Sequence, residues 1–108
     1  MRARREKRRP EQWILRLYIA GHTARGASAL RNLESVCEEH LAGRYRIEVV
    51  DLLEQPQLAR GDQIVALPTL VRRLPPPMKK IIGDLSNQER LLVGLDLRRG
   101  DPLRQGPA

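Results

Sequence analysis

The chain has 108 residues, enough for one domain with a single hydrophobic core, and it contains one Cys, three aromatic residues and no Phe. A single Cys excludes an internal disulfide and a Cys-x-x-Cys redox pair, and no apolar run reaches the roughly 18 residues that a membrane span requires. The net charge is +7, but +5 of it lies in residues 1–10, where six Lys or Arg residues accompany one Glu.

Residues 1–12 are predicted to be a flexible basic arm. The charges are not followed by the hydrophobic segment of a signal peptide, so we expect a soluble, cytoplasmic protein. A basic arm can attract nucleic acid or an anionic membrane surface independently of sequence. Its charges are not interleaved with aromatic rings on which bases could stack, so no specific nucleic-acid contact is expected. Polyanion binding through the arm remains one alternative function.

The first half of the chain predicts a βαβ unit. Residues 13–20 (WILRLYIA) are rich in β-formers with one charge, which is typical of a strand buried on both faces. Thr23 is the expected N-cap of a helix over residues 24–42, whose apolar residues recur at three- and four-residue steps. Residues 46–52 (RIEVVDL) predict a second strand, parallel to the first because a helix connects the two.

A second, shorter helix is predicted to begin at Pro56, because proline is favoured at the first helical position. Leu58, Asp62 and Val65 would follow at the i, i+4 and i+7 spacing of one helical face. The helix would connect the second strand to the extended segments that come next.

Two short extended segments, residues 67–74 and 79–82, flank three consecutive prolines at residues 75–77. Three prolines exclude both a helix interior and a central strand, so this stretch predicts a rigid turn. Residues 99–108 contain two Gly and two Pro and predict a disordered tail. Residues 13–98 are therefore expected to form a single α/β domain.

Residues 86–97 satisfy the sequence rules for a helix and for a strand. Ser86 and Glu89 have the spacing of a capping box, and three leucines then share one helical face. Alternate residues from Leu91 to Leu97 are also apolar, at the period of two that a half-buried strand requires. Gly94 disfavours both states, by roughly 1 kcal/mol relative to Ala in a helix. Local propensity thus leaves the two structures close in free energy.

The predicted element order, with Leu67-Pro68-Thr69 before the third strand, resembles the thioredoxin fold. That resemblance implies a cis proline at Pro68. Thioredoxins carry paired cysteines at the start of the first helix, where this chain has His22-Thr23-Ala24-Arg25. Dithiol chemistry is therefore not expected, although a thioredoxin-like binding or redox module without a Cys-x-x-Cys centre remains an alternative.

Several stretches resemble the KaiB family of circadian clock proteins more closely. They are residues 17–21 (LYIAG), 50–53 (VDLL), 55–59 (QPQLA), 67–70 (LPTL) and 74–87 (LPPPMKKIIGDLSN). The resemblance runs from Trp13 to Arg98 without an evident gap, and the triproline block is highly specific. It implies two folds for one chain: a thioredoxin-like βαβαββα form that binds the partner, and a ground state, often tetrameric, with the order βαββααβ. The ambiguous residues 86–97 are the helix of one form and a strand of the other.

The resemblance also implies a partner, the first ATPase domain of a hexameric KaiC-type ATPase and kinase, and a non-enzymatic timing function. The implied contact residues are Leu53, Gln57, Gln63 and Ile64. The implied fold-switch residues are Pro68, Pro75, Pro76, Pro77, Gly94 and Asp96. A homodimer or homotetramer in the ground state is a further implication. Neither the resting fold nor the oligomeric state follows from the sequence.

The chain departs from the cyanobacterial pattern at several positions. Gln63 replaces a Lys of the KaiC-facing helix, Glu48 replaces a Lys on the strand that meets KaiA, and Ser28 replaces an Arg. Arg98-Arg99-Gly100 replaces the acidic tail. The reversed charge at Glu48 disfavours KaiA as a partner. The pattern suits a divergent KaiB, for example in an hourglass timer or stress regulator with KaiC alone, although a true oscillator stays open.

Residues that could carry chemistry form no catalytic or metal-binding pattern, so no catalytic residue, metal or cofactor is expected. His22 and His40 stand at opposite ends of the first helix and are expected to face solvent. Cys37 lies on the apolar stripe of that helix and is expected to be buried and inert. The residue pairs 72–73 and 79–80 form a basic cluster, read either as a solvated turn or as a contact for acidic residues of a partner or sister subunit.

Overall fold

The computed structural model describes residues 12–97. The predicted arm, apart from Gln12, and the predicted tail lie outside the described residues. In chain order the elements are β1 (Trp13–Ile19), α2 (Ala24–Leu41), β2 (Tyr45–Asp51), α3 (Leu58–Asp62), β3 (Thr69–Leu74), β4 (Lys79–Ile82) and α4 (Gln88–Leu95). This is the βαβαββα order predicted for the thioredoxin-like form.

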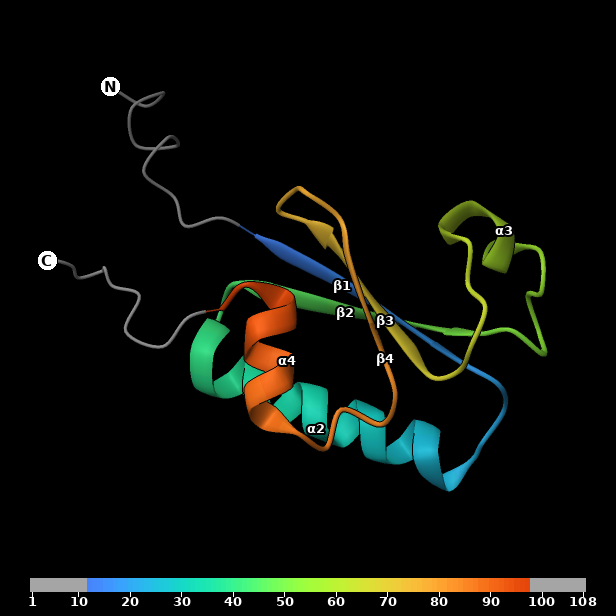
Figure 1. The fold of residues 1–108 in the computed structure, drawn as a ribbon, viewed down its shortest axis with the longest axis horizontal. Helices are drawn as coiled ribbons and strands as arrows, with labels where there is room; N and C mark the ends of the chain where they lie inside the picture. The colour runs from blue at the N-terminus through green and yellow to red at the C-terminus, as the bar shows by residue number, and fades with distance from the viewer. Residues whose placement is uncertain (1–11, 98–108) are drawn as a thin grey trace, which may run out of the picture.

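The strands form one sheet in the order β2-β1-β3-β4 (Figure 1). β1 pairs with β2 in parallel, as the βαβ prediction requires, and the register begins with Trp13 opposite Tyr45. β3 runs antiparallel to β1, and β4 runs antiparallel to β3. β2 and β4 are thus the edge strands of the described sheet.

The main core lies between the sheet and two helices, α2 and α4, on one face (Figure 1). Thr23 is the N-cap of α2, as predicted, and its Oγ1 accepts a hydrogen bond of 3.0 Å from the main-chain N–H of Gly26. Most of the apolar stripe of α2 is fully buried, including Leu33 and Cys37, and Leu30 is partly buried against the same core. Leu91 and Leu95 of α4 are buried in the same cluster. Burial of such aliphatic side chains contributes about 1.5–3 kcal/mol each.

A smaller cluster lies on the other face, under α3. Tyr18, Val50 and Val71 are its buried members, and Leu58 and Ile64 pack against them. α3 covers only one end of this face, and Arg16 and Ile14 of β1 are half-buried. The expectation that the first strand is buried on both faces was therefore wrong for its N-terminal half.

The predicted helix at Pro56 begins later than expected. α3 starts at Leu58, and the preceding residues form turns in which the N–H of Ala59 donates to the carbonyl oxygen of Pro56 at 3.2 Å. Gln63 has a φ of 53°, a left-handed conformation that ends the helix after Asp62. Val65, expected on the helical face, lies beyond this end and is 87% exposed.

In this structure the ambiguous segment is a helix, α4, and its N-cap is one residue later than predicted. The side-chain oxygen of Asn87 accepts a hydrogen bond of 3.0 Å from the N–H of Arg90. Ser86, the predicted cap, instead donates its main-chain N–H to Asp84. Asn is as effective an N-cap as Ser, so the two adjacent residues compete for one position.

Candidate partner-binding surface

The loop that carries Leu53 is fixed at the ends of two parallel strands by Asp51. One carboxylate oxygen of Asp51 accepts hydrogen bonds from the N–H of Gly21, at 2.8 Å, and from the N–H of Leu53, at 2.9 Å. Donors of this kind favour the ionised form and lower the pKa of Asp51 below its ordinary value. Gly21 has a φ of +69°, and a Cβ there would lie 2.9 Å from Leu53 Cδ1. Leu53 is therefore held against the end of β1 while it remains 71% exposed.

A buried polar network anchors α3 to the sheet. The hydroxyl of Tyr18 donates to Asp62 Oδ2 at 2.6 Å, and Nη1 of Arg73 lies 3.0 Å from both carboxylate oxygens. Burial, together with the bond to Asp62, raises the pKa of Tyr18. Arg16 extends the network, from the Tyr18 hydroxyl at 3.4 Å to Glu48 at 3.1 Å. Because both carboxylate oxygens of Asp62 are hydrogen-bonded, α3 has a fixed position over the smaller cluster around Tyr18.

The four predicted contact residues lie in one continuous segment, residues 53–64, that contains α3. Leu53, Gln57 and Gln63 are exposed, which leaves their side chains available to a partner. Ile64 is half-buried and packs against the second cluster, so it also supports the fold. Their roles in binding stay predictions, but the structure places all four at the end of the sheet that α3 covers (Figure 1).

The predicted fold-switch prolines lie at both ends of β3. Pro68 is buried before β3, and the Leu67-Pro68 peptide bond is cis, as the thioredoxin resemblance implied. The turn after β3 contains Pro75, Pro76 and Pro77, with cis bonds before the first and the third. This turn lies at the end of the sheet opposite to α3 (Figure 1).

The two predicted switch residues of the last segment occupy constrained positions in α4. A Cβ added to Gly94 would lie 2.7 Å from Cδ1 and 2.8 Å from Cγ1 of Ile81, so α4 approaches β4 closely at this point. Asp96 has a φ of 65° and forms the left-handed C-cap of the helix, where its N–H donates to carbonyls of the last turn. Gly94 therefore allows α4 to pack closely on β4, and Asp96 ends the helix.

Sequence reasoning missed the role of Arg72. This side chain is only 3% exposed, and its guanidinium lies 5.2 Å from the ring centroid of Trp13. It is therefore not part of a solvated basic cluster, as the pairs 72–73 and 79–80 had suggested. Alternation along β3 could have identified it, because Leu70 and Arg72 point to the same face of the strand.

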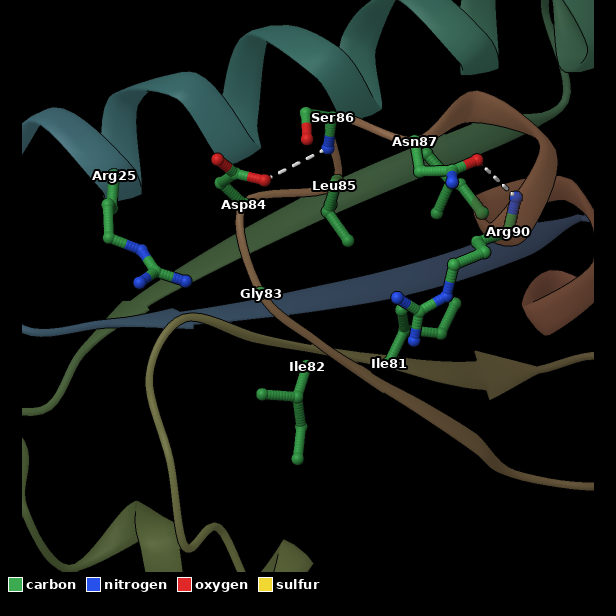
Figure 2. Close-up of a pocket in the computed structure, with 10 residues that line it drawn as sticks. Arg25, Ile81, Ile82, Gly83, Asp84, Leu85, Ser86, Asn87 and Arg90 are labelled. Atoms are coloured by element: carbon green, nitrogen blue, oxygen red, sulfur yellow. Dashed lines mark hydrogen bonds between the residues drawn. The ribbon is translucent and has the colours of Figure 1, made fainter.

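Figure 2 shows a small pocket of about 140 Å³ at the turn that precedes α4. Arg25 and Arg90 flank it, and Asp84 accepts a hydrogen bond of 3.1 Å from the N–H of Ser86. The hydroxyl and the N–H of Ser86 lower the pKa of Asp84, with a smaller contribution from Arg25. These bonds fix the start of the helix.

The Cys and His residues considered as candidates for chemistry are not grouped in a reactive site. Cys37 is fully buried, and desolvation raises the pKa of its thiol to about 12, so the reactive thiolate is scarce at neutral pH. His22 is exposed, as predicted, whereas His40 is half-buried. Within residues 12–97, no three His, Cys, Asp or Glu side chains are grouped as metal ligands would be. No helix in the same range is both long and apolar enough to cross a bilayer.

Comparison with known structures supports the fold. The chain is similar to the N-terminal domain of SasA from Synechococcus elongatus, with a TM-score of 0.67 and 21% identity, over 85% of this chain and 90% of that one. Mitochondrial thioredoxin 3 from Saccharomyces cerevisiae matches with a TM-score of 0.63 and 20% identity, over 88% and 87% of the two chains. At such identities the likeness concerns the thioredoxin-like fold alone.

Sequence comparison identifies the family. The model of the KaiB domain matches residues 16–97. The chain is 48% identical over 84 residues to the circadian clock protein KaiB3 of Synechocystis sp., covering 78% of this chain and 82% of that protein. It is 51% identical over 85 residues to the clock oscillator protein KaiB of Microcystis aeruginosa, covering 79% and 82%. The chain belongs to the KaiB family, whose members are clock regulatory proteins and not enzymes.

Proposed function

We propose that this protein regulates timing by binding a KaiC-type ATPase hexamer in its thioredoxin-like form, and that its C-terminal half also adopts the ground-state order βαββααβ. A partner that binds one of two forms has an apparent affinity reduced by the fraction of that form. Its association rate is then limited by the conversion. Slow capture of the ATPase would supply the delay that a clock or hourglass timer requires.

The exposed side chains of Leu53, Gln57 and Gln63 in segment 53–64 are the observation that carries the proposed contact. The segment carries an exposed apolar side chain, Leu53, and its backbone is fixed by hydrogen bonds to Asp51, which precedes it, and through the buried carboxylate of Asp62. Exposed apolar side chains on a fixed backbone bind with little loss of conformational entropy. Such a surface suits a protein partner better than a small molecule.

The sequence and packing of α4 support the proposed second fold. Residues 86–97 have both helical and strand periodicity, and Gly94 lowers the intrinsic stability of the helix. The α4 helix has only 8 residues, too few to be stable alone in water, so its state depends on contacts with the rest of the protein. A rearrangement of those contacts would allow residues 88–95 to leave the helical state.

Capture of the protein by an immobilised KaiC-type hexamer tests the proposed contact. Leu53→Ser should weaken capture by about 10- to 150-fold, the equivalent of one buried Leu at about 1.5–3 kcal/mol. Met78→Gln is the matched control, because Met78 is also exposed, at 51%, but lies in the turn at the opposite end of the sheet. Equal capture of both variants and the wild type would contradict the proposed surface.

Neither alternative function has specific structural support. A redox module would need a reactive thiol, and Cys37 is buried with a strongly raised pKa. Reduction of insulin disulfides that depends on Cys37 would overturn this conclusion. Polyanion binding by the arm concerns residues outside the described range. Oligomerisation in the ground state, as a dimer or tetramer, and the absence of KaiA from the partners remain part of the proposal.

A further inference from the structure

An acidic groove runs between the C-terminal end of α2 and the outer side of α4. Its volume is about 770 Å³, and its lining residues are Glu39, His40, Gln88, Glu89, Leu92, Val93, Asp96 and Leu97. Three carboxylates and no Lys or Arg are among them; Asp96 already has an interaction partner, and Glu39 Oε1 lies 3.9 Å from His40 Nε2. Val93, in the wall, is 77% exposed. The groove therefore offers an apolar surface bordered by negative charge.

The same chain contains a segment of complementary charge. Residues 1–10 include six Lys or Arg residues and one Glu. Long basic side chains can place their methylene stems along apolar surface while their charged ends pair with carboxylates. A cation near the C-terminal end of a helix also interacts favourably with the helix dipole, typically by about 0.3–1 kcal/mol. The groove borders that end of α4, at Asp96 and Leu97.

Residues 1–10 precede β1, and the start of β1 lies next to this groove. The N–H of Trp13 donates to the carbonyl oxygen of Arg44 at 2.8 Å. The guanidinium of Arg44 donates in turn to the carbonyl oxygen of His40, a groove residue, at 3.3 Å. The start of β1 thus lies at the same end of the sheet as α4 and the C-terminal end of α2 (Figure 1).

The arm is long enough to reach along the groove. An extended segment of 10 residues, the length of residues 1–10, spans up to about 36 Å. α4 has 8 residues, so its axis is about 12 Å long. We propose that residues 1–10 dock in the groove between α2 and α4 and thereby stabilise α4 as a helix. The effect on fold choice rests on the proposed function, whereas docking itself does not.

Paramagnetic broadening in the full chain tests docking directly, without KaiC. A nitroxide attached through Ala3→Cys should broaden the amide signals of Glu89, Leu92 and Val93 at low salt. The signals of Arg16 and Glu48, on the other face of the sheet, should be unaffected. Cys37 is fully buried, so the wild-type chain serves as the labelling control. Broadening should disappear near 1 M salt, where the Debye length is about 3 Å.

Charge variants define the site. Glu39→Gln and Glu89→Gln together should reduce the broadening at least several-fold. Glu34→Gln, also exposed on α2 but outside the lining, should leave it unchanged. Deletion of residues 2–10 should accelerate hydrogen exchange at Leu91 and Leu95 but not at Leu15 of β1. Absence of broadening at the groove, or equal broadening on both faces, would overturn the proposal.

Two further samples distinguish the occupant. In the first sample, a nitroxide-bearing copy without isotope labels is mixed with an isotope-labelled copy that has no nitroxide. Broadening of the isotope-labelled signals would show that the arm binds a second copy instead. Removal of residues 99–108 should leave the broadening intact, and its loss would overturn the proposed site by showing that the arm reaches the groove only with the C-terminal segment. Unchanged hydrogen exchange together with observed docking would overturn the stabilising effect alone.

Discussion

Nη1 of Arg72 lies 2.6 Å from the carbonyl oxygen of Leu95, so a buried cation on β3 is hydrogen-bonded to the C-terminal end of α4. The other terminal nitrogen of the same guanidinium donates to the carbonyl oxygen of Pro77 at 2.8 Å. One side chain therefore joins the triproline turn to the last helix. Both are segments that the family resemblance associates with fold switching.

Replacement of Arg72 should destabilise the thioredoxin-like form strongly. A hydrogen bond to a charged group contributes about 1.5–3 kcal/mol, so Arg72→Met should lower the free energy of unfolding by at least that amount. Arg72→Lys should recover only part of the loss, because one ammonium cannot reproduce the planar fork that reaches both carbonyls. Urea denaturation followed by circular dichroism measures the change. Lys80→Met, at an exposed position, is the control, and equal midpoints for Arg72→Met and the control would refute this role.

Gly94→Ala should not simply stabilise α4. Helix propensity favours Ala by about 1 kcal/mol, but the new Cβ would lie 2.7 Å from Ile81 Cδ1 and 2.8 Å from Cγ1. We expect a gain well below 1 kcal/mol, or a loss, in the wild-type background. In the Ile81→Ala background the full gain should appear. A double-mutant cycle of unfolding free energies measures the coupling, which should be at least about 0.5 kcal/mol, and additivity would contradict the contact.

The thiol of Cys37 should resist chemical modification in the folded protein. Burial raises its pKa from 9.0 to about 12, which lowers the thiolate fraction at pH 8 by about 1000-fold. Modification by a chromogenic disulfide reagent should therefore be slow at pH 8 and become rapid in denaturant. Rapid modification in native buffer, with no accompanying unfolding, would show that the thiol is accessible.

Acid should weaken the loop that holds Leu53. The folded pKa of Asp51 is lower than its unfolded value, so its contribution to stability is present above the unfolded pKa, near 3.9, and is lost as pH falls through the folded pKa. Asp51→Asn should flatten the stability profile in this acidic range. Asp84, whose pKa is also lowered, should remain titratable in that variant. Identical profiles for Asp51→Asn and wild type between about pH 2 and 5 would contradict the assignment.

The sequence predicts the order of elements well because each is encoded locally. Thr23 and the apolar stripe of α2 specify one helix between two strands, and the triproline turn separates β3 from β4. Boundaries were less accurate where neighbours compete, as Ser86 and Asn87 do for the cap of α4. Pro56 did not mark the first residue of the helix, because residues 56–57 form a hydrogen-bonded turn and α3 starts at Leu58.

The long-range features could not be predicted from local patterns. The bond of Tyr18 to Asp62 joins residues 44 positions apart, and the bond of Arg72 to Leu95 joins residues 23 apart. The close approach of Gly94 to Ile81 likewise depends on how α4 packs on β4. The predicted contact residues came from family resemblance, and their exposure on segment 53–64 is consistent with that role without testing it.

The central claim is that the C-terminal half adopts two folds, of which the KaiC-type partner binds one. Proton–nitrogen NMR with carbon secondary shifts for residues 88–95 tests it most directly, with and without the hexamer. We predict that extended shifts are populated in the free chain and that addition of the hexamer depletes them in favour of helical shifts. A single set of helical shifts, in the free chain at every concentration and in the complex, would contradict the account.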